Sequence, residues 1–369
     1  MVEHYQIAII GGGPAGLAAA IEAGTAGAKT LLIDENARPG GQLFKQIHKF
    51  FGSRAHNAGI RGFDIGTSLL RDTEQAGVSV WLNSVVVGIF EENHLYVVHD
   101  CGGKKEMRAI QAEKILVAAG GQESPIMFEG WTLPGVMGAG CAQTMINVNR
   151  VLPGKNVIMI GSGNVGLIVS YQLMQAGANV VGIVEAANNI GGYGVHAAKI
   201  KRAGVEFYLG HTIVRAVADL EVVSRAVIGK LDHNKKIIPG RELSFEVDMI
   251  CFAVGLTPSA KLTQLQGARQ VFMPAMGGWM PMHDKNMETS IAGLYVAGDA
   301  AGVEEANTAM DEGRLAGIAM VQSLGLMKND VAEEKKAEIR GRLRSLRLGP
   351  FGERRLRAKE SIMRGERDE

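Results

Sequence analysis

Residues 5–35, YQIAIIGGGPAGLAAAIEAGTAGAKTLLIDE, give the strongest indication of the architecture of this chain. Residues 5–10 are mostly apolar and favour a buried strand, and Gly11, Gly13 and Gly16 follow at the GxGxxG spacing. An alanine-rich helix and a second apolar strand come next, which is the context that this motif needs. In such a unit the first glycine permits the tight turn, the second lets the backbone approach a pyrophosphate, and the third lets the helix pack closely on the strand. The stretch therefore predicts a dinucleotide-binding unit whose helix N-terminus faces the phosphates.

The same pattern occurs a second time in residues 155–185. KNVIMI predicts a strand, GSGNVG supplies Gly161, Gly163 and Gly166, a helix follows, and ANVVGIVE predicts the next strand. The two copies align without a gap from the first glycine to the acid that ends the second strand. A single GxGxxG arises by chance, whereas two copies in matching units are a specific signal for two dinucleotide sites.

The acid that ends the second strand of such a unit normally binds the hydroxyls of the adenosine ribose. In the second unit this acid is Glu185, and residues 186–188 contain no Arg or Lys that would meet a 2′-phosphate. The second unit is therefore expected to prefer NAD(H) over NADP(H). In the first unit Asp34 and Glu35 both stand at the strand end, and strict alignment of the two copies selects Glu35.

A third signature, residues 289–317, predicts a strand, LYVAGD, then a loop and a helix. With it, the chain resembles the two-dinucleotide-binding flavoproteins, the thioredoxin-reductase-like and glutathione-reductase-like enzymes, over roughly residues 4–325. The resemblance rests on six motifs: GGGPAG, PGGQL (39–43), ILVAAGG (115–121), GSGNVG, ICFAVGLTP (250–258) and YVAGD (295–299).

This resemblance implies bound FAD and NAD(H), and it assigns residues to them. Asp299 would bind the FAD ribityl chain, and the helix entered near Asn307 and Thr308 would point its N-terminus at the flavin pyrimidine ring. Reduced flavin is negative there, and a helix N-terminus stabilises negative charge. In the first unit the resemblance selects Asp34, which we favour over Glu35. Further cofactor contacts are implied for Pro14, Ala15, Gly41, Gln42, Val85, Ala119, Gly120, Asn164, Val165, Gly255 and Gly298.

The expected fold is α/β, with two Rossmann-like domains, the NAD domain inserted in the FAD domain, and a short helical C-terminal extension. The FAD-binding domain would comprise residues 1–120 and 250–326, and the NAD-binding domain residues 121–249. Residues 327–369 are rich in Lys and Arg with interspersed acids, a pattern typical of solvated charged helices. Docking of a partner subunit is the alternative for this basic extension.

A closer resemblance lies in FEGWTLPGVMGAGCAQT, residues 128–144. This segment is similar to one in the α subunits of heteromeric sarcosine oxidases, proline and hydroxyproline dehydrogenases, opine oxidases and hydrogen cyanide synthases. Those subunits work beside a second flavoprotein subunit that oxidises an amine or amino acid. Several of them carry extra domains with clustered cysteines, and no such cluster occurs in this sequence.

The loop GGQLFKQIHKFFGS, residues 40–53, resembles the one that carries two redox cysteines in many flavoprotein disulfide reductases, yet it contains no cysteine. Gln42, Lys45 and His48 are the polar side chains expected to approach the flavin, and no catalytic residue is assigned. The adjacent Phe50 and Phe51 suit either a surface over the flavin edge or core packing. Electrons are therefore expected to leave to a small molecule or to a partner protein.

The three cysteines, Cys101, Cys141 and Cys251, lie far apart and form no CxxC, so neither an iron–sulfur cluster nor a zinc site is encoded locally. We expect buried free thiols, no metal and a reducing cytoplasmic location. The N-terminus lacks the basic region of a signal peptide, and no stretch suits a membrane span. A net charge of +1 gives no indication of nucleic-acid binding.

Together these features predict an FAD-dependent, NAD(H)-linked oxidoreductase that transfers hydride between nicotinamide and flavin. We expect it to be one subunit of an amine or amino-acid dehydrogenase or oxidase, acting with a second flavoprotein subunit or a small electron-carrier protein on a small-molecule substrate. One alternative is a stand-alone NADH:acceptor reductase of the ferredoxin type. The other is a non-catalytic dinucleotide-binding subunit.

Overall fold

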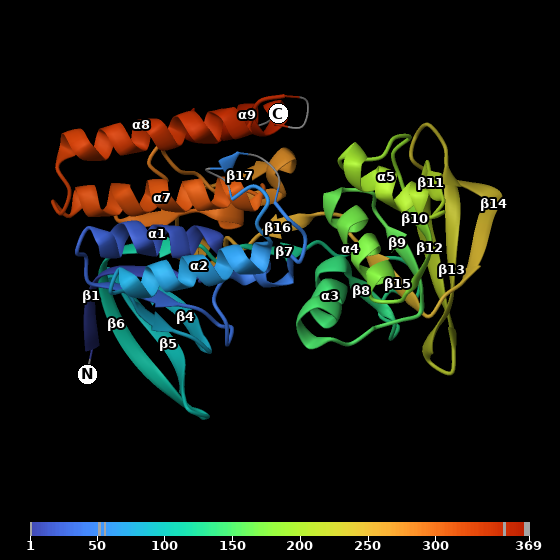
Figure 1. The fold of residues 1–369 in the computed structure, drawn as a ribbon, viewed down its shortest axis with the longest axis horizontal. Helices are drawn as coiled ribbons and strands as arrows, with labels where there is room; N and C mark the ends of the chain where they lie inside the picture. The colour runs from blue at the N-terminus through green and yellow to red at the C-terminus, as the bar shows by residue number, and fades with distance from the viewer. Residues whose placement is uncertain (1, 51–52, 55–56, 350–351, 365–369) are drawn as a thin grey trace. The chain divides into compact units, whose positions relative to one another are not determined.

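The computed structural model describes residues 2–50, 53–54, 57–349 and 352–364, except the side chains of Cys101 and Arg364. The chain forms two compact units. One contains the residues up to Gln122 together with those from Leu256 onward, and the other runs Glu123–Gly255. The second unit is therefore an insertion in the sequence of the first (Figure 1).

The first unit is built on a seven-stranded sheet in the order β3-β2-β1-β6-β5-β4, with β19 also pairing with β6. The long strand β6 changes partner along its length, because its first part is antiparallel to β5 and its later part is parallel to β1 and β19. The centre of the sheet is mostly apolar and buried, as strands covered on both faces must be. This holds for residues 7–10 of β1, for β2, for residues 115–117 of β6 and for β19. The strands are β1 (Val2–Ile10), β2 (Thr30–Ile33), β3 (Ser79–Trp81), β4 (Ser84–Phe90), β5 (His94–Cys101), β6 (Lys104–Val117) and β19 (Leu294–Val296).

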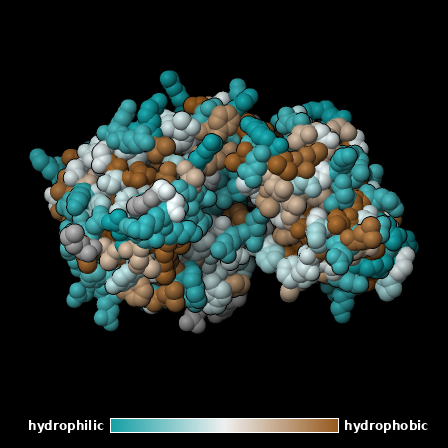
Figure 2. Space-filling view, turned by 90° about the horizontal axis from the view of Figure 1, so that it is seen from below, coloured by the Kyte–Doolittle hydropathy of each residue, from teal (hydrophilic) through white to brown (hydrophobic). Residues whose placement is uncertain are grey.

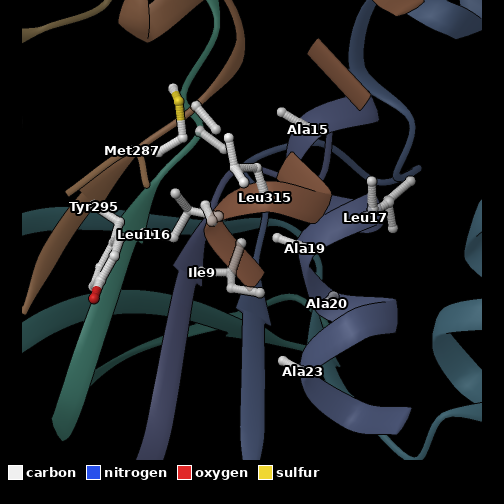
Figure 3. Close-up of a cluster of buried hydrophobic side chains, with 14 of the residues drawn as sticks. Ile9, Ala15, Leu17, Ala19, Ala20, Ala23, Leu116, Met287, Tyr295 and Leu315 are labelled. Carbon is white, nitrogen blue, oxygen red and sulfur yellow. The ribbon is translucent and has the colours of Figure 1, made fainter. Parts of the chain in front are cut away.

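Two helices of the first unit, α1 (Pro14–Thr25) and α7 (Ala306–Ser323), pack so closely that their contact requires glycine. A Cβ added to Gly313 of α7 would lie 2.0 Å from the backbone oxygen of Ala15 in α1. The small side chains on α1 permit this approach, which holds the N-terminal half of α7 against the start of α1. Figure 3 shows part of this buried cluster, with Ala15 and Ala19 of α1 on the side of Leu315, Ile9 and Leu116, and Leu17 pointing away on the other side of α1.

The C-terminal helices α8 (Asn329–Leu346) and α9 (Glu353–Arg364) belong to the first unit, and α8 runs along α7 (Figure 1). The expectation of solvated charged helices is wrong for three cations of this C-terminal region, two in the helices and one just after α8. Lys336, Arg347 and Lys359 are at most 7% exposed. Ala332, Ile339 and Leu343 of α8 join the same core as α1 and α7. The other elements of this unit are α2 (Gly62–Gln75), α6 (Lys261–Leu265), the hairpin β17 (Gln270–Met273) and β18 (Gly278–Pro281), and the paired strands β7 (Gly121–Glu123) and β16 (Leu256–Pro258).

The second unit contains a five-stranded parallel sheet in the order β11-β10-β9-β15-β8. Helices cover one face of this sheet, and an antiparallel three-stranded sheet packs against its other face. The parallel strands are β8 (Val136–Gly138), β9 (Asn156–Ile160), β10 (Asn179–Glu185), β11 (Phe207–Leu209) and β15 (Met249–Phe252). The helices are α3 (Ala139–Thr144), α4 (Asn164–Gln175) and α5 (Gly194–Arg202), and the antiparallel strands are β12 (His211–Asp219), β13 (Val222–Leu231) and β14 (Ile237–Glu246).

The predicted fold class is confirmed: the chain is α/β, with two Rossmann-like sheets and C-terminal helices. On the face shown in Figure 2, hydrophobic residues form small patches separated by hydrophilic ones in both units. Such scattered patches are normal on a protein surface. Within the described part of the chain, no helix is both long and apolar enough to span a bilayer.

Candidate dinucleotide-binding sites

The first glycine turn lies between β1 and α1, and its three glycines have different neighbours. Gly11 has φ +105°, and a Cβ there would lie 2.3 Å from the backbone oxygen of Ala118. A Cβ at Gly16 would lie 1.8 Å from the oxygen of Gly11. Both glycines are therefore required by the fold itself. A Cβ at Gly13, in contrast, would meet no atom of the described residues within 4 Å, so these residues leave the space in front of Gly13 open.

The second glycine turn, between β9 and α4, repeats this arrangement. Gly161 also has φ +105°, and a Cβ there would lie 2.3 Å from the backbone oxygen of Ala253. A Cβ at Gly166 would lie 2.3 Å from the oxygen of Gly161, and one at Gly163 would again meet nothing within 4 Å. Each of the two glycine turns thus has one glycine that no neighbouring atom of the described residues requires, at the position where a dinucleotide pyrophosphate approaches such a turn.

Asp34 and Glu185 occupy equivalent positions beside these turns. Oδ2 of Asp34 accepts a hydrogen bond from the backbone nitrogen of Gly12 at 2.5 Å. Oε2 of Glu185 accepts from the backbone nitrogen of Ser162 at 3.0 Å and from its Oγ at 2.6 Å. Glu35 is exposed. Strict alignment of the two copies therefore selected the wrong residue, Glu35, because the structure places Asp34 at the turn.

A β-bulge explains the one-residue difference. The pairing of β1 with β2 is continuous and ends with Ile10 opposite Ile33. The pairing of β9 with β10 shifts between Val180 and Gly182, so that β10 contains one extra residue. The bulge moves Glu185 into the position that Asp34 occupies in the first unit.

The loop after β2 lies over the first glycine turn. The backbone nitrogen of Gly40 donates to the oxygen of Gly12 at 2.5 Å, and a Cβ at Gly41 would lie 3.0 Å from the Cα of Gly13. Gln42 is exposed in the same short helical turn, and Lys45 ends that turn. His48 lies farther along the loop, stacked on Phe50 with ring centroids 5.9 Å apart. Of the three polar candidates, Gln42 is the one next to Gly41, which lies against the glycine turn. Phe51 lies outside the described residues.

Asp299 follows Gly298, which has φ +68° and begins the short helical turn Gly298–Ala301 after β19. Its Oδ1 accepts a hydrogen bond from the backbone nitrogen of Glu304 at 3.3 Å. Burial raises the pKa of Asp299 to about 6 against the effect of this hydrogen bond. The carboxylates of Glu312, Glu304 and Glu305 raise this pKa further.

The three signatures of the first unit meet at the start of α7. A Cβ at Gly298 would lie 3.0 Å from the Cβ of Ala15 in the glycine turn and 3.4 Å from the Cβ of Ala309 in α7. A Cβ at Gly121 would lie 3.4 Å from the Cβ of Asp299, which brings the turn containing Ala119 and Gly120 to the same place.

The first turn of α7 contains a side-chain amide oxygen that the described residues leave without a hydrogen bond. Oδ1 of Asn307 is enclosed and has no hydrogen-bond partner among the described residues. Oγ1 of the buried Thr308 donates to the backbone oxygen of Glu305 at 2.6 Å. An enclosed acceptor without a partner is costly, and a bound group with a hydrogen-bond donor would remove this cost.

The remaining predicted contacts divide between the units. Val85 is exposed and follows Ser84, whose backbone nitrogen donates to the oxygen of Asp34 at 2.9 Å, so Val85 lies near that acid. In the second unit, Oδ1 of Asn164 already accepts from the backbone nitrogen of Tyr193 at 2.8 Å. Val165 is exposed beside Asn164, and Gly255, with φ +125°, lies at the end of this unit.

Sequence reasoning missed a cation beside Glu185. Nζ of Lys235, in the turn between β13 and β14, donates to the backbone oxygen of Ala186 at 2.7 Å. Lys235 has φ +62° within this tight turn. The contact joins residues far apart in the chain, so no local sequence motif could predict it. The absence of Arg and Lys from residues 186–188 is therefore not an absence of positive charge from this site.

The cysteine predictions are partly wrong. Cys251 is buried, and burial raises the pKa of its thiol, but Cys141 is exposed. The side chain of Cys101 lies outside the described residues. Among the residues that the structure describes, no group of three or more His, Cys, Asp or Glu side chains could hold a metal ion.

Two curated proteins each match most of this chain. It is 29% identical over 350 residues to one of the subunits of the opine oxidase of Agrobacterium tumefaciens, covering 89% of this chain and 68% of that one. It is 27% identical to the hydrogen cyanide synthase subunit HcnB of Pseudomonas protegens, covering 92% of this chain and 75% of that one.

Solved structures show the same fold. The L-proline dehydrogenase from P. horikoshii has a TM-score of 0.66 and 25% identity, and the match covers 92% of this chain but only 60% of that chain. The thioredoxin reductase from T. acidophilum has a TM-score of 0.70 at 16% identity, with coverages of 87% and 99%.

The family model described as pyridine nucleotide-disulphide oxidoreductase matches residues 5–313. This span includes both glycine turns, Asp299 and the first turn of α7. The chain therefore belongs to the pyridine nucleotide-disulphide oxidoreductase family.

Proposed function

We propose that this chain is an FAD-dependent, NAD(H)-linked oxidoreductase that works as a subunit of an amine or amino-acid dehydrogenase or oxidase. The observation that supports it best is the repeated open space at Gly13 and Gly163. In each unit a glycine that the protein itself does not require faces a helix N-terminus and lies near a hydrogen-bonded acid. Two such turns suit two dinucleotides.

The first unit fits FAD. Its helix α1 directs backbone N–H groups toward the open space at Gly13, and Asp34 lies where a ribose would be bound. Asp299 offers a carboxylate for the ribityl chain, and the unpartnered amide oxygen of Asn307 offers an acceptor at the start of α7. That helix N-terminus also favours negative charge on a bound group.

The second unit fits NAD(H), with Glu185 at the adenosine ribose and the N-terminus of α4 at the pyrophosphate. When bound, FAD would supply a two-electron centre and NAD(H) would donate or accept the hydride. The chain's own residues then bind and orient the two groups, and alignment rather than acid–base chemistry is the main requirement.

Two substitutions in the second unit test the choice of nicotinamide. Glu185→Ala removes the carboxylate that would accept ribose hydroxyls and repel a 2′-phosphate. We expect kcat/KM for NADH to fall about ten- to a hundredfold, since a hydrogen bond to a charged group contributes about 1.5–3 kcal/mol. The ratio of kcat/KM for NADH to that for NADPH should fall as well.

Lys235→Ala serves as the opposite change. It removes the ammonium next to Ala186 but leaves the carboxylate, so residual use of NADPH should decrease while kcat/KM for NADH stays near wild type. Steady-state dye reduction with NADH and with NADPH measures kcat/KM for the wild type and both variants. An unchanged NADH:NADPH ratio in Glu185→Ala would exclude Glu185 as the discriminating residue.

The subunit role is supported by the names of the relatives, two of which are subunits of an opine oxidase and of a hydrogen cyanide synthase. The chain spans 60% of the length of the proline dehydrogenase chain that it matches. The partner subunit and the amine or amino-acid substrate are therefore proposals for this chain. A second flavoprotein subunit or a small electron carrier would take electrons from this chain or deliver them to it.

Assays with and without a co-expressed partner test this role. We expect the isolated chain, loaded with FAD, to reduce artificial dyes with NADH but to turn over no amino acid. Co-expression with the products of neighbouring genes should give dye reduction that depends on an amine or amino acid. Full turnover of a physiological acceptor by the lone chain would favour a stand-alone NADH:acceptor reductase. Nucleotide binding without any dye reduction would favour a non-catalytic subunit.

A further inference from the structure

The C-terminal helices carry buried cations that face the loop containing Asp299. Arg347, just after α8, and Lys359, in α9, are 7% and 1% exposed. Burying a cation is costly unless it is paired and hydrogen-bonded. The partners of these two cations therefore show what the C-terminal helices are built to hold.

Arg347 binds two carboxylates at once. Its Nη2 donates to Oε1 of Glu312 at 2.6 Å, and its Nε donates to both carboxylate oxygens of Glu304 at 3.0 Å. The other oxygen of Glu312, Oε2, accepts from the backbone nitrogen of Gly298 at 3.1 Å. An unbroken chain of hydrogen bonds thus runs from Arg347 to the residue immediately before Asp299.

Lys359 reaches the same loop from α9. Its Nζ lies 2.8 Å from Oε1 of Glu312 and donates to the backbone oxygen of Ala301 at 2.8 Å. Nε2 of His283 lies 3.3 Å from the same Nζ. Burial, and then the charge of Lys359, lower the pKa of His283 to about 4, so this ring is neutral and accepts from Lys359. Its Nδ1 then donates to the backbone oxygen of Asp284 at 2.9 Å.

The loop of residues 298–304 is therefore held at three points on both sides of Asp299. These points are the backbone nitrogen of Gly298, the backbone oxygen of Ala301 and the carboxylate of Glu304. Glu304 also donates its backbone N–H to Asp299. Displacement of Arg347 would release Glu304, and displacement of Lys359 would release Ala301. Either change would also remove one of the two cations that hold Glu312 at Gly298.

We propose that Arg347 and Lys359 are positioning residues for FAD, and that the C-terminal helices clamp the loop that presents Asp299 to the cofactor. This inference rests on the proposed assignment of FAD to the first unit. It gives the basic extension a role within the chain, in place of a solvated surface.

The clamp also balances charge around Asp299. The groups that face this region are Glu304 in the loop, Glu305 and Glu312 at α7, and the cations Arg347 and Lys359, with His283 neutral. Glu305 lies 3.8 Å from Arg355 in a partly exposed pair. Removing a buried cation leaves the carboxylates uncompensated and should favour protonation of Asp299. Removing the charge of Glu312 should do the opposite.

The test is the affinity of the purified full-length apoprotein for FAD, titrated by quenching of flavin fluorescence across pH 5–8. At pH 7 we expect Arg347→Met and Lys359→Met to bind FAD at least about tenfold more weakly than wild type, because the loop is no longer held. The pH at which affinity falls by half should move upward in both variants and downward in Glu312→Gln. A role limited to overall stability would not move this midpoint in opposite directions.

Arg342→Met is the matched control. Arg342 lies in α8 and pairs with Asp311 of α7 at 3.0 Å and with Glu338 of its own helix, both outside the loop of residues 298–304. Its FAD affinity and pH midpoint should equal those of wild type. Arg347→Lys keeps the positive charge but cannot hydrogen-bond Glu304 and Glu312 in the same way. This variant should bind FAD more weakly than wild type with an unchanged pH midpoint.

Thermal melting of each apoprotein shows which variants fold. Should the two methionine variants fail to fold, Arg347→Lys and Glu312→Gln decide the question through the midpoints expected above. The clamp is refuted if folded Arg347 or Lys359 variants bind FAD as wild type does, or if Arg342→Met loses affinity equally. A wild-type chain that binds no FAD would instead contradict the proposed function.

Discussion

Gly13→Val is expected to weaken FAD binding by a hundredfold or more while leaving the apoprotein folded. Gly13 has φ −75° and ψ −174°, a conformation open to any residue, and a Cβ there meets no protein atom. The valine side chain would instead occupy the space of the pyrophosphate and displace it from the backbone N–H groups. Loss of two hydrogen bonds to a charged group, each about 1.5–3 kcal/mol, weakens binding about a hundred- to ten-thousandfold. Equilibrium titration with FAD measures the loss.

The second glycine turn supplies the matched control. Gly163 has φ −66° and ψ 174°, and a Cβ there is equally unobstructed. Gly163→Val should therefore abolish binding of NADH but leave the affinity for FAD unchanged. In Gly16→Ala, by contrast, the new Cβ would lie 1.8 Å from the backbone oxygen of Gly11, so this variant should unfold at lower temperature. Retention of full FAD affinity in Gly13→Val would show that the first unit does not bind the cofactor at this turn.

Asp299→Asn is expected to weaken FAD binding about ten- to a hundredfold at pH 7.5 and to remove much of its pH dependence. The pKa of Asp299 is raised to about 6, chiefly by burial. The ionised carboxylate is the stronger acceptor for ribityl hydroxyls, so FAD binding favours ionisation. The wild-type affinity should therefore fall by about tenfold between pH 7 and pH 5, as the side chain takes up a proton.

The apoprotein should show the opposite trend. A carboxyl whose pKa is raised on folding stabilises the folded state at low pH, and this stabilisation is lost as the pH rises through about 6. Asp299→Asn should remove this dependence too, which thermal melting of the apoprotein can follow from pH 5 to pH 7. An FAD affinity in the wild type that does not change between pH 5 and pH 7 would contradict the role given to Asp299.

The sequence predicted the elements whose causes are local. The two glycine turns could be found because Gly11 and Gly161 need a positive φ, and Gly16 and Gly166 contact backbone a few residues away. The buried parallel strands could be found because their apolar runs are continuous. These features depend on short segments, and short segments are what a single sequence shows clearly.

Features set by pairing between strands were harder to predict. The first glycine and the aligned acid are equally far apart in the sequences of the two units. The bulge between Val180 and Gly182 nevertheless shifts the pairing of β10 with β9 by one residue. Asp34, rather than the aligned Glu35, therefore corresponds to Glu185. Nothing in the residues of β10 marks the bulge, because it depends on how this strand pairs with β9.

Long-range contacts of charged side chains were missed entirely. Lys235 reaches Ala186 across a turn of another sheet, and Arg347 and Lys359 reach the loop after β19 from the C-terminal helices. In the sequence these cations are indistinguishable from their solvated neighbours. Burial of a cation is decided by whether tertiary structure supplies carboxylates, as Glu304 and Glu312 do here.

Anaerobic addition of NADH to the FAD-loaded protein shows whether hydride passes from nicotinamide to flavin. We predict that stoichiometric NADH bleaches the absorbance band of oxidised flavin, that NADPH does so more slowly, and that Gly163→Val keeps its FAD but is not bleached. A wild-type protein that holds FAD and remains yellow in excess NADH would contradict the account.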